Sequence, residues 1–225
     1  MAVLSPPTQS TISINKGYLR VKRIFDIVFT ILIMIPLLVV IGIFAIFIRL
    51  DSKGPVFFRQ KRVGRNGEEF YILKLRSMYI DSDDSAHRES IKLYMNGAAL
   101  NGKGGSDSLY KLVDAPRVTR VGRFIRKTSI DELPQFINVF QGEMTLVGPR
   151  PPLPYEVEEY GPHEWLRLSG KPGLTGTWQV YGRSRVPFQK MVEMDIEYLG
   201  HQSLLEDLKL IALTLPVMLK GRGGA

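Results

Sequence analysis

The feature that most limits how this chain can fold is an apolar run near its N-terminus. Between Asp26 and Arg49, the segment 27–48 carries no charged side chain. As a helix it would be about 33 Å long, which is enough to cross the hydrocarbon core of a bilayer. A signal peptide is a poor interpretation, because the run is longer than a usual signal core and no small-residue cleavage site follows it. We therefore expect this segment to stay in the mature protein and to enter the membrane.

The charges on either side of this run constrain its topology. Basic residues crowd both flanks: Lys16, Arg20, Lys22 and Arg23 before it, and Arg49, Lys53, Arg59, Lys61, Arg62 and Arg65 after it. The positive-inside rule places both ends in the cytoplasm, which one straight span cannot satisfy. Pro36 interrupts the helical hydrogen bonds, so a re-entrant helix-break-helix that dips into one leaflet and returns would satisfy both flanks. A kinked spanning helix is the alternative, and these residues alone favour neither.

The overall composition indicates an anionic ligand and excludes several kinds of metal and disulfide site. Lys+Arg 30 against Asp+Glu 22 gives a net charge of +8. This excess points to an anionic partner: a nucleic acid, an acidic membrane surface or a phosphorylated substrate. Cysteine is absent from the sequence, which excludes disulfides, thiolate metal sites and cysteine nucleophiles. A histidine-rich metal site is not expected either, because the histidines are far apart: His87, His163 and His201.

Two adjacent carboxylates, Asp131 and Glu132, lie in the basic segment Arg126–Pro134. An ionised carboxylate can act as a nucleophile or hold a divalent cation, and guanidinium groups bind phosphate oxygens. The apolar residues that follow have helical spacing and predict a short buried helix that ends at Gly142, with Asp131 opposite the apolar stripe: Leu133, Phe136, Ile137 and Phe140. Ser129 and Glu132 also fit a capping box, in which Glu132 only satisfies a backbone donor. Without the neighbouring motifs we prefer that structural interpretation.

Other basic side chains are candidates for phosphate contacts. The segment 55–78 predicts two strands around a turn at 64–67, with Lys74 and Arg76 on one face of the second strand. An exposed basic edge that resists aggregation explains this pair equally well. Arg150 lies in the rigid segment Gly148–Pro152, and Arg183 ends a glycine-punctuated loop. Arginines at every third residue predict a helix with a basic face before the acidic pair: Arg117, Arg120, Arg123 and Arg126.

Two further segments have structural interpretations. The glycine-rich stretch 96–108 contains a lysine between glycines, but it lacks the spacing and the Ser/Thr of a phosphate-binding P-loop, so a surface loop is the better interpretation. Segments 188–199 and 204–219 predict helices. The second has few charges, and it fits an interfacial amphipathic helix as well as a helix packed on the core.

The order of these blocks resembles the bacterial sugar transferases, the monotopic polyprenyl-phosphate phosphoglycosyl transferases that start the assembly of exopolysaccharides, O-antigens and glycoproteins. No single block is specific, but their shared order makes coincidence unreasonable. The matching blocks are Lys22–Asp26, Phe58–Gly64, Lys74–Met78, Arg126–Gln135, Gly148–Pro151, and Lys171–Gly176 continuing through Gln179–Arg183.

The resemblance implies a reaction and a role for each candidate residue. In that family the aspartate at Asp131 attacks a UDP-sugar, forms an aspartyl phosphosugar and releases UMP, and polyprenyl (undecaprenyl) phosphate then takes the sugar phosphate. Mg²⁺ would neutralise the diphosphate. Glu132 would assist at the metal or in proton handling, so both acids are catalytic and metal-binding candidates. The remaining candidates would hold phosphate or nucleotide: Arg126, Arg150, Arg183 and, more weakly, Lys74 and Arg76.

The resemblance also implies an architecture and a location. We expect a mostly helical α+β, monotopic membrane protein with a small β-hairpin and interfacial amphipathic helices. Its parts would be a mobile tail over residues 1–21, a re-entrant membrane helix over 22–50 and a cytoplasmic catalytic domain over 51–225. The enzyme would lie on the cytoplasmic face of the bacterial inner membrane. Ile35–Pro36 replaces the Ser-Pro of some relatives, which leaves the geometry of the break open. Thr177–Gln179 stands where many relatives have Trp-Ala-Gln, a difference that concerns the contacts with the sugar or the membrane.

A different class of protein is the alternative: a non-enzymatic, membrane-tethered basic protein that binds anionic lipid or nucleic acid through its arginines. The resemblance favours UDP-sugar, polyprenyl phosphate and membrane lipid as partners, and no nucleic acid. The sequence does not reveal which sugar is transferred or which glycan pathway is served, because specificity depends on the shape of a pocket. A homodimer formed through the membrane helices also stays open, since no heptad pattern is present.

Overall fold

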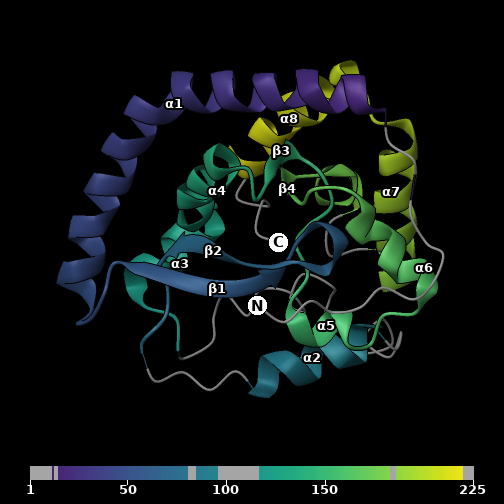
Figure 1. Cartoon of the computed structure of the whole chain (residues 1–225). Helices are drawn as coiled ribbons and strands as arrows, with labels where there is room; N and C mark the ends of the chain where they lie inside the picture. The colour runs from purple at the N-terminus through teal and green to yellow at the C-terminus, as the bar shows by residue number, and fades with distance from the viewer. Residues whose placement is uncertain (1–11, 13–14, 81–84, 96–116, 183–185, 220–225) are drawn as a thin grey trace.

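The computed structural model describes residues 12, 15–80, 85–95, 117–182 and 186–219 (Figure 1). The chain is mostly helical with two small sheets, as the expected α+β class requires. Arg183 and the glycine-rich stretch 96–108 lie outside the described residues, as does most of the tail predicted over 1–21. The helices beyond the first are α2 (Ser85–Met95), α3 (Arg120–Lys127), η4 (Ile130–Gln135), α4 (Phe136–Gln141), α5 (Pro154–Val157), α6 (Pro162–Trp165), η5 (Leu166–Ser169), η6 (Trp178–Gly182), α7 (Phe188–His201) and α8 (Leu204–Leu219).

The apolar run forms one long helix, α1 (Lys16–Asp51), which begins before the predicted membrane segment. Asn15 caps it, because its Oδ1 accepts a hydrogen bond of 2.8 Å from the Gly17 amide. Figure 1 shows α1 crossing one side of the molecule and then bending down an adjacent side. Pro36 lies inside the helix and explains a bend, since it removes one backbone hydrogen bond. The structure thus has a bent, continuous helix where we predicted a helix, a break and a second helix.

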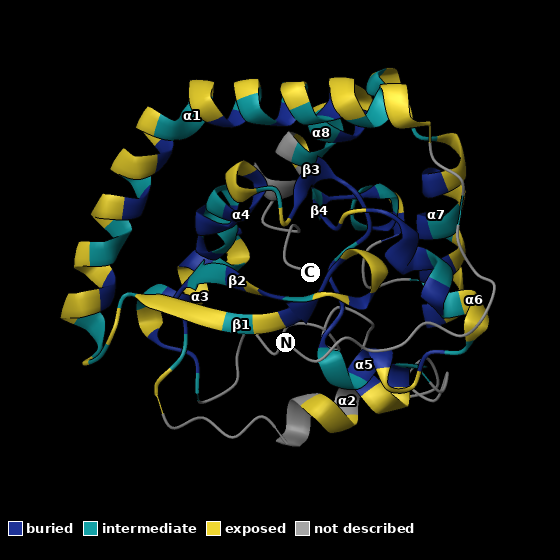
Figure 2. Ribbon diagram, viewed as in Figure 1, coloured by how far each residue is buried: buried dark blue, intermediate teal, exposed yellow. Residues whose placement is uncertain are grey.

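One face of α1 packs on the rest of the protein and the opposite face is bare. Figure 2 shows the alternation of buried and exposed residues along both arms of the helix. Within the described part of the chain, α1 is the only helix long and apolar enough to cross a membrane, and just 17% of its most apolar window is buried. The bare face consists of large apolar side chains: Val21, Ile24, Val28, Ile31, Leu32, Ile35, Leu38, Val39, Ile43, Ile46, Phe47 and Leu50. Such a face suits contact with lipid.

A buried polar network ties the first arm of α1 to the helices at the end of the chain. The Lys22 ammonium pairs with the Asp207 carboxylate of α8 and donates a hydrogen bond of 3.2 Å to the Tyr198 hydroxyl of α7. Tyr18 donates a hydrogen bond of 2.7 Å to the same carboxylate. One turn further along α1, Asp26 accepts a hydrogen bond of 2.7 Å from the Thr145 hydroxyl. We call Tyr18, Lys22, Tyr198 and Asp207 the anchor network.

The predicted β-hairpin is confirmed. Strands β1 (Phe57–Val63) and β2 (Glu69–Leu75) pair antiparallel, with Phe57 opposite Leu75 and Val63 opposite Glu69. The short helical turn η1 (Arg65–Gly67) joins them. Asn66 and Gly67 both have positive φ there, which tight hairpin turns favour.

A second sheet was not predicted. Strands β3 (Thr145–Val147) and β4 (Gly173–Thr175) pair in parallel and bring Gly148 beside Gly173. A Cβ atom on Gly148 would lie 2.5 Å from the Lys171 carbonyl oxygen, so only glycine fits at this approach. Each strand is too short to show the alternation of apolar and polar residues by which a strand is predicted. Their parallel pairing also depends on a long crossover connection, which local sequence does not reveal.

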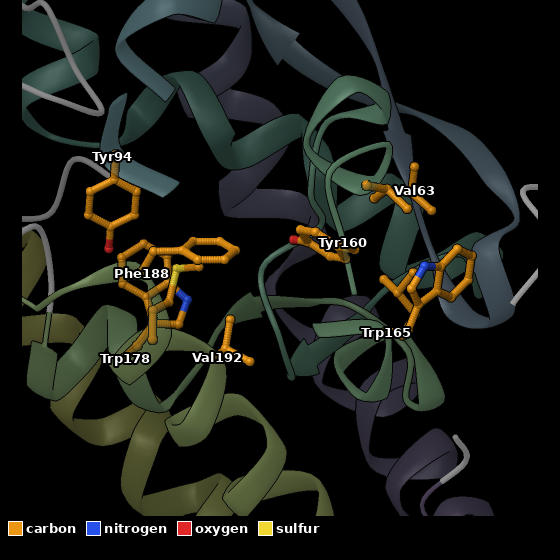
Figure 3. Packing of buried hydrophobic residues seen from close by; sticks show 10 residues of the cluster. Val63, Tyr94, Tyr160, Trp165, Trp178, Phe188 and Val192 are labelled. Atoms are coloured by element: carbon orange, nitrogen blue, oxygen red, sulfur yellow. The ribbon is translucent and has the colours of Figure 1, made fainter. Parts of the chain in front are cut away.

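Aromatic side chains fill the part of the core farthest from α1. Figure 3 shows Tyr94, Phe188 and Trp178 close together, with Tyr160, Trp165, Val63 and Val192 in the same cluster. Tyr94 and Phe188 meet edge to face at a centroid distance of 6.0 Å. This cluster joins β1, α2, α6, η6 and α7 into one support for the loops between them.

The prediction that the apolar stripe after Asp131 is the buried face of its helix is wrong. Gly142 ends the helix with a φ of 87°, as predicted. However, Asn138 and Val139 are buried while Phe140 is 48% exposed. Phe136 packs only partly, beside the apolar residues of α1. The apolar stripe therefore faces α1 and the surface next to it, and the opposite face, which carries Asp131, faces the interior.

The last two helices agree closely with the predicted ranges. In α8, Asp207 and Leu210 are buried, whereas Leu205 and Leu208 are 78% and 49% exposed. The helix thus packs on the core and also presents apolar side chains outward. Its proposed place in the membrane interface stays a prediction.

Candidate active site

Asp131 sits at the start of η4, immediately after a sharp change in chain direction. Ser129, just before η4, adopts the left-handed conformation with a φ of 57°. This turn points the Asp131 side chain inward, and only 2% of the residue is exposed. The Ser129 side chain makes no capping hydrogen bond, so the predicted capping box does not form. Glu132 is not used as a helix cap of that kind.

Glu132 is joined to the hairpin by Lys74. The Lys74 ammonium lies 2.9 Å from Glu132 Oε1, with side-chain exposures of 17% and 26%. The structure therefore brings Lys74 to the acidic pair, as the phosphate-site interpretation requires. Partial exposure leaves Glu132 accessible to a ligand.

Asn138 fixes this geometry from one helix turn away. Its Oδ1 accepts a hydrogen bond of 3.2 Å from the Leu73 amide, and its Nδ2 donates one of 2.8 Å to the Tyr71 carbonyl. A third bond of 2.7 Å runs from Nδ2 to Glu143. The amide thus bonds to the free backbone groups on the outer edge of β2. These bonds hold the strand, and with it Lys74, next to Asp131 and Glu132. We did not predict this role, because a helical asparagine gives no sign of its distant partner.

Arg126 lies beside both acids. Burial lowers the pKa of its guanidinium, while the charges of Asp131 and Glu132 act in the opposite direction and that of Arg117 acts with burial. The structure therefore brings Arg126 and Arg117 close to the acidic pair, and the phosphate-binding role of Arg126 stays a prediction. The three-residue arginine repeat contained this signal, but Arg120 and Arg123 of the same repeat are exposed.

Arg150 approaches the site from the loop after β3. The neighbouring Arg62 of β1 is 4% exposed and donates a hydrogen bond of 2.9 Å to the Pro151 carbonyl, which fixes this loop. Burial and the charge of Arg150 lower the pKa of Arg62 to about 10. The charges of Glu156, Tyr155 and Glu132 oppose this shift. Arg62 and Glu156 are thus buried members of the site that the sequence did not reveal.

Arg76 binds the end of α1 in this structure. Its guanidinium donates hydrogen bonds of 2.7 Å to the carbonyls of Ser52 and Lys53 and one of 2.9 Å to the Ser52 hydroxyl. It therefore satisfies carbonyl groups at the end of α1, where a cation also complements the helix dipole. These contacts give Arg76 a structural role, and its phosphate-binding role stays a prediction. Arg183 lies outside the described residues and stays a prediction.

The acidic pair is compatible with Mg²⁺. The described residues contain no group of three or more potential metal-ligating side chains from His, Cys, Asp and Glu. Mg²⁺ commonly uses one or two protein carboxylates and completes its coordination with water and substrate phosphate. The buried Asp131 and the partly exposed Glu132 fit that pattern.

Among the residues that the structure describes, cations outnumber carboxylates around the acidic pair. The acids of the site are Asp131, Glu132 and Glu156, and its cations are Arg62, Lys74, Arg117, Arg126 and Arg150. Holding so many cations together is unfavourable unless an anion binds among them. The arrangement therefore suits a ligand with several phosphate charges.

Comparison with known proteins agrees with this chemistry. The sequence profile described as "Bacterial sugar transferase" matches residues 17–221. The chain belongs to this family. The match covers α1, the hairpin and every candidate site residue, so the family assignment applies to the whole site.

Individual relatives of the family are similar over most of this chain. It is 44% identical over 212 residues to galactosyl transferase CpsE of Streptococcus agalactiae, covering 92% of the chain and 44% of the relative. It is 39% identical over 206 residues to exopolysaccharide production protein ExoY of Sinorhizobium fredii, covering 90% and 87%. It is 39% identical over 205 residues to undecaprenyl-phosphate galactose phosphotransferase of Salmonella typhimurium, covering 90% and 41%. The chain thus spans less than half of two relatives and most of the third.

Proposed function

We propose that this protein is a phosphoglycosyl transferase that moves a sugar-1-phosphate from a UDP-sugar to polyprenyl (undecaprenyl) phosphate and releases UMP. The step would be the first membrane reaction in the synthesis of an exopolysaccharide or another glycoconjugate. The observation that carries the proposal is the buried Asp131, set with Glu132 among an excess of cations. The names of the relatives supply the substrate class.

The proposed reaction has two displacements at one phosphorus atom. A carboxylate oxygen of Asp131 attacks the β-phosphorus, and the bond from that phosphorus to the bridging oxygen breaks, so that UMP leaves with the bridging oxygen. An oxygen of polyprenyl phosphate then attacks the same phosphorus. The bond to Asp131 breaks, which restores the carboxylate and yields polyprenyl diphosphosugar.

The surrounding residues would bind and orient the donor. Arg126 and Arg150 would hold phosphate oxygens, and Lys74 would orient Glu132 through their 2.9 Å contact. Asp131 and Glu132 would hold Mg²⁺, which when bound neutralises diphosphate charge so that an anionic nucleophile can approach. Arg62 would keep the Arg150 loop in place through Pro151.

The nucleophile is tested by Asp131→Asn in the full chain. We expect UMP release from UDP-sugars to fall by at least about a thousand-fold, with thermal unfolding unchanged. Incubation of the wild type with UDP-sugar alone should add the mass of one sugar phosphate to the peptide that contains Asp131. Glu193→Gln, an exposed carboxylate on α7, is the matched control. Full activity in Asp131→Asn would refute the covalent step at Asp131, whereas absence of UMP release from the wild type would favour the membrane-tethered binding protein.

We also propose that α1 is re-entrant and that the catalytic domain lies on the cytoplasmic face of the inner membrane. The bend at Pro36 and the basic flanks support this topology. Because the chain has no cysteine, Ser10→Cys and Gly223→Cys give clean single labels at the two ends. A membrane-impermeant thiol reagent should label both in inverted vesicles and neither in intact spheroplasts. Labelling of Ser10→Cys from the outside would establish a spanning helix instead.

A further inference from the structure

A second group of cations lies near the start of α1, away from the acidic pair. Arg23 comes from α1, Arg65 from the turn of the hairpin and Lys171 from the segment before β4. Arg23 and Lys171 lie beside Gly142, which ends α4, whereas Asp131 lies before the start of that helix. Along the helical segment this separation is on the order of 15 Å. The proposed reaction uses none of these three side chains.

Arg23 and Lys171 approach each other beside Gly142, which has no side chain to separate them. Arg23 donates hydrogen bonds of 2.6 Å to the Val139 carbonyl and 2.8 Å to the Phe140 carbonyl. A Cβ atom on Gly142 would lie 3.2 Å from Arg23 Nη2 and 3.6 Å from Lys171 Nζ. The two cationic groups therefore flank the same point. Arg23 has five N–H donors and uses two of them on these carbonyls, so others remain for an anion.

Acids do not balance this group. Burial lowers the pKa of Lys171, and the charges of Arg23 and Arg65 lower it further. Asp26 alone opposes this shift, and its carboxylate already binds the Thr145 hydroxyl and the Leu146 amide. Among the described residues, none of the three cations forms an ion pair with a carboxylate. An anion bound between them would remove this repulsion.

Exposed apolar side chains lie close to Arg23 along the chain. Val21 and Ile24 flank Arg23 in the sequence and are 49% and 63% exposed. Phe140, whose carbonyl binds Arg23, is 48% exposed. Val21 and Ile24 belong to the bare face of α1. A ligand that suits both features has a phosphate group and an apolar tail.

We propose that Arg23 and Lys171, with the positive charge of Arg65 on the neighbouring hairpin turn, form a binding site for a lipid-borne phosphate group, either that of an anionic phospholipid or that of polyprenyl phosphate. The phosphate would bind above Gly142 between Arg23 and Lys171, and the acyl or prenyl chain would lie along Ile24 and Phe140. Because the site is at the opposite end of α4 from Asp131, a phosphate there would not be in position to react. The site would hold the membrane helix at the depth of the headgroups.

The test measures lipid binding by the full chain without UDP-sugar, so its outcome is independent of the proposed reaction. Native mass spectrometry of the detergent-solubilised protein would follow titrations with phosphatidylglycerol, phosphatidylcholine and polyprenyl phosphate. We expect Lys171→Gln and Arg65→Gln each to weaken binding of the preferred anionic lipid about five-fold. Lys190→Gln, which removes an exposed lysine of α7, is the matched control and should bind as the wild type does.

The lipid titrations distinguish the two sources. Selective retention of phosphatidylglycerol would identify a phospholipid site, and selective retention of polyprenyl phosphate would identify a docking site for the acceptor. Equal binding by Lys171→Gln, Arg65→Gln and the control would overturn the proposal. Displacement of the lipid by an equal concentration of inorganic phosphate would also overturn it, because the apolar tail would then contribute nothing.

Discussion

Two buried groups of charges in this molecule differ in how completely they are balanced. In the anchor network, the Asp207 carboxylate is matched by the Lys22 ammonium and by the hydroxyls of Tyr18 and Tyr198. Around Asp131 and Glu132, cations from four separate segments exceed the carboxylates. The anchor network is closed to solvent, whereas the group around Asp131 is partly open at Lys74 and Glu132, and both groups connect residues far apart in the sequence.

The difference separates a structural group from a binding site. A closed network offers no group to a ligand, and its disruption leaves a buried charge without compensation. A group with excess positive charge is less stable alone and gains when an anion binds. We therefore expect substitutions in the anchor network to change the free energy of unfolding and those near Asp131 to change mainly substrate binding and turnover. The following four predictions are ordered by their expected effect on unfolding.

Asp207→Leu should have the largest effect, because it leaves the Lys22 ammonium buried without its carboxylate. We expect the free energy of unfolding to fall by about 3–5 kcal/mol, measured by denaturant titration in mixed micelles. The double variant Lys22→Met/Asp207→Leu should recover a large part of this loss. If the double variant is as unstable as the single one, the loss reflects packing of α8 and the charge argument is wrong.

Arg76→Leu should come next, since it removes the donors that satisfy the carbonyls of Ser52 and Lys53. We expect a loss of about 2–3 kcal/mol in the same titration. The Michaelis constant for UDP-sugar should stay the same in the protein that remains folded. An increase in that constant with normal stability would instead place Arg76 among the phosphate-binding residues.

Asn138→Asp should destabilise by about 1–2 kcal/mol at neutral pH and show a distinctive pH dependence. Its new carboxyl would face the Tyr71 carbonyl and the Glu143 carboxylate, which raises its folded pKa above the unfolded value of about 3.9. The protonated form can still donate a hydrogen bond, so stability is retained below the unfolded pKa and lost as pH rises through the folded pKa. Turnover relative to wild type should fall over the same pH range.

Glu143→Gln in the Asn138→Asp background provides a check, because its amide can donate to the new carboxylate. We expect it to restore part of the stability at neutral pH. A relative pH profile that is flat for Asn138→Asp would contradict a role in holding Lys74 against Glu132.

Arg126→Gln should have the smallest effect on unfolding, within about 0.5 kcal/mol of wild type, because removing a buried cation from an excess of cations costs little. UDP-sugar turnover should nevertheless fall about 10- to 100-fold in a UMP-release assay. Lys127→Gln, the exposed neighbour at the end of α3, is the control. Normal turnover in Arg126→Gln would remove this arginine from the site.

The parts of this structure that follow from local pattern could be predicted from the sequence. The apolar run, the hairpin turn at 64–67 and the helix stop at Gly142 all depend on neighbouring residues. The acidic pair and Lys74 could be placed in one site because their motifs occur in family order. The side chain of Asp131 also lies opposite the apolar stripe, as its position on the helical wheel indicates.

The parts that depend on distant contacts could not be predicted. Nothing near Arg76 shows that its partners are carbonyls of residues 52 and 53, and nothing near Asn138 identifies the edge of β2. The burial of the segment 133–140 was misjudged for a different reason. An apolar stripe usually marks the face toward the core, but next to α1 such a stripe can also face the side on which we expect lipid.

The close approach of Gly148 to the Lys171 carbonyl has a consequence for engineering donor specificity. The β3–β4 pairing joins the segments 145–150 and 171–176 backbone to backbone, with glycines at the points of contact. In chimeras between family members, the two segments should therefore be exchanged together. If only the Arg150 segment is exchanged, a foreign loop must pack against the native segment 171–176 at a spacing that leaves no room for an extra atom. If both segments are exchanged, their backbone packing is preserved.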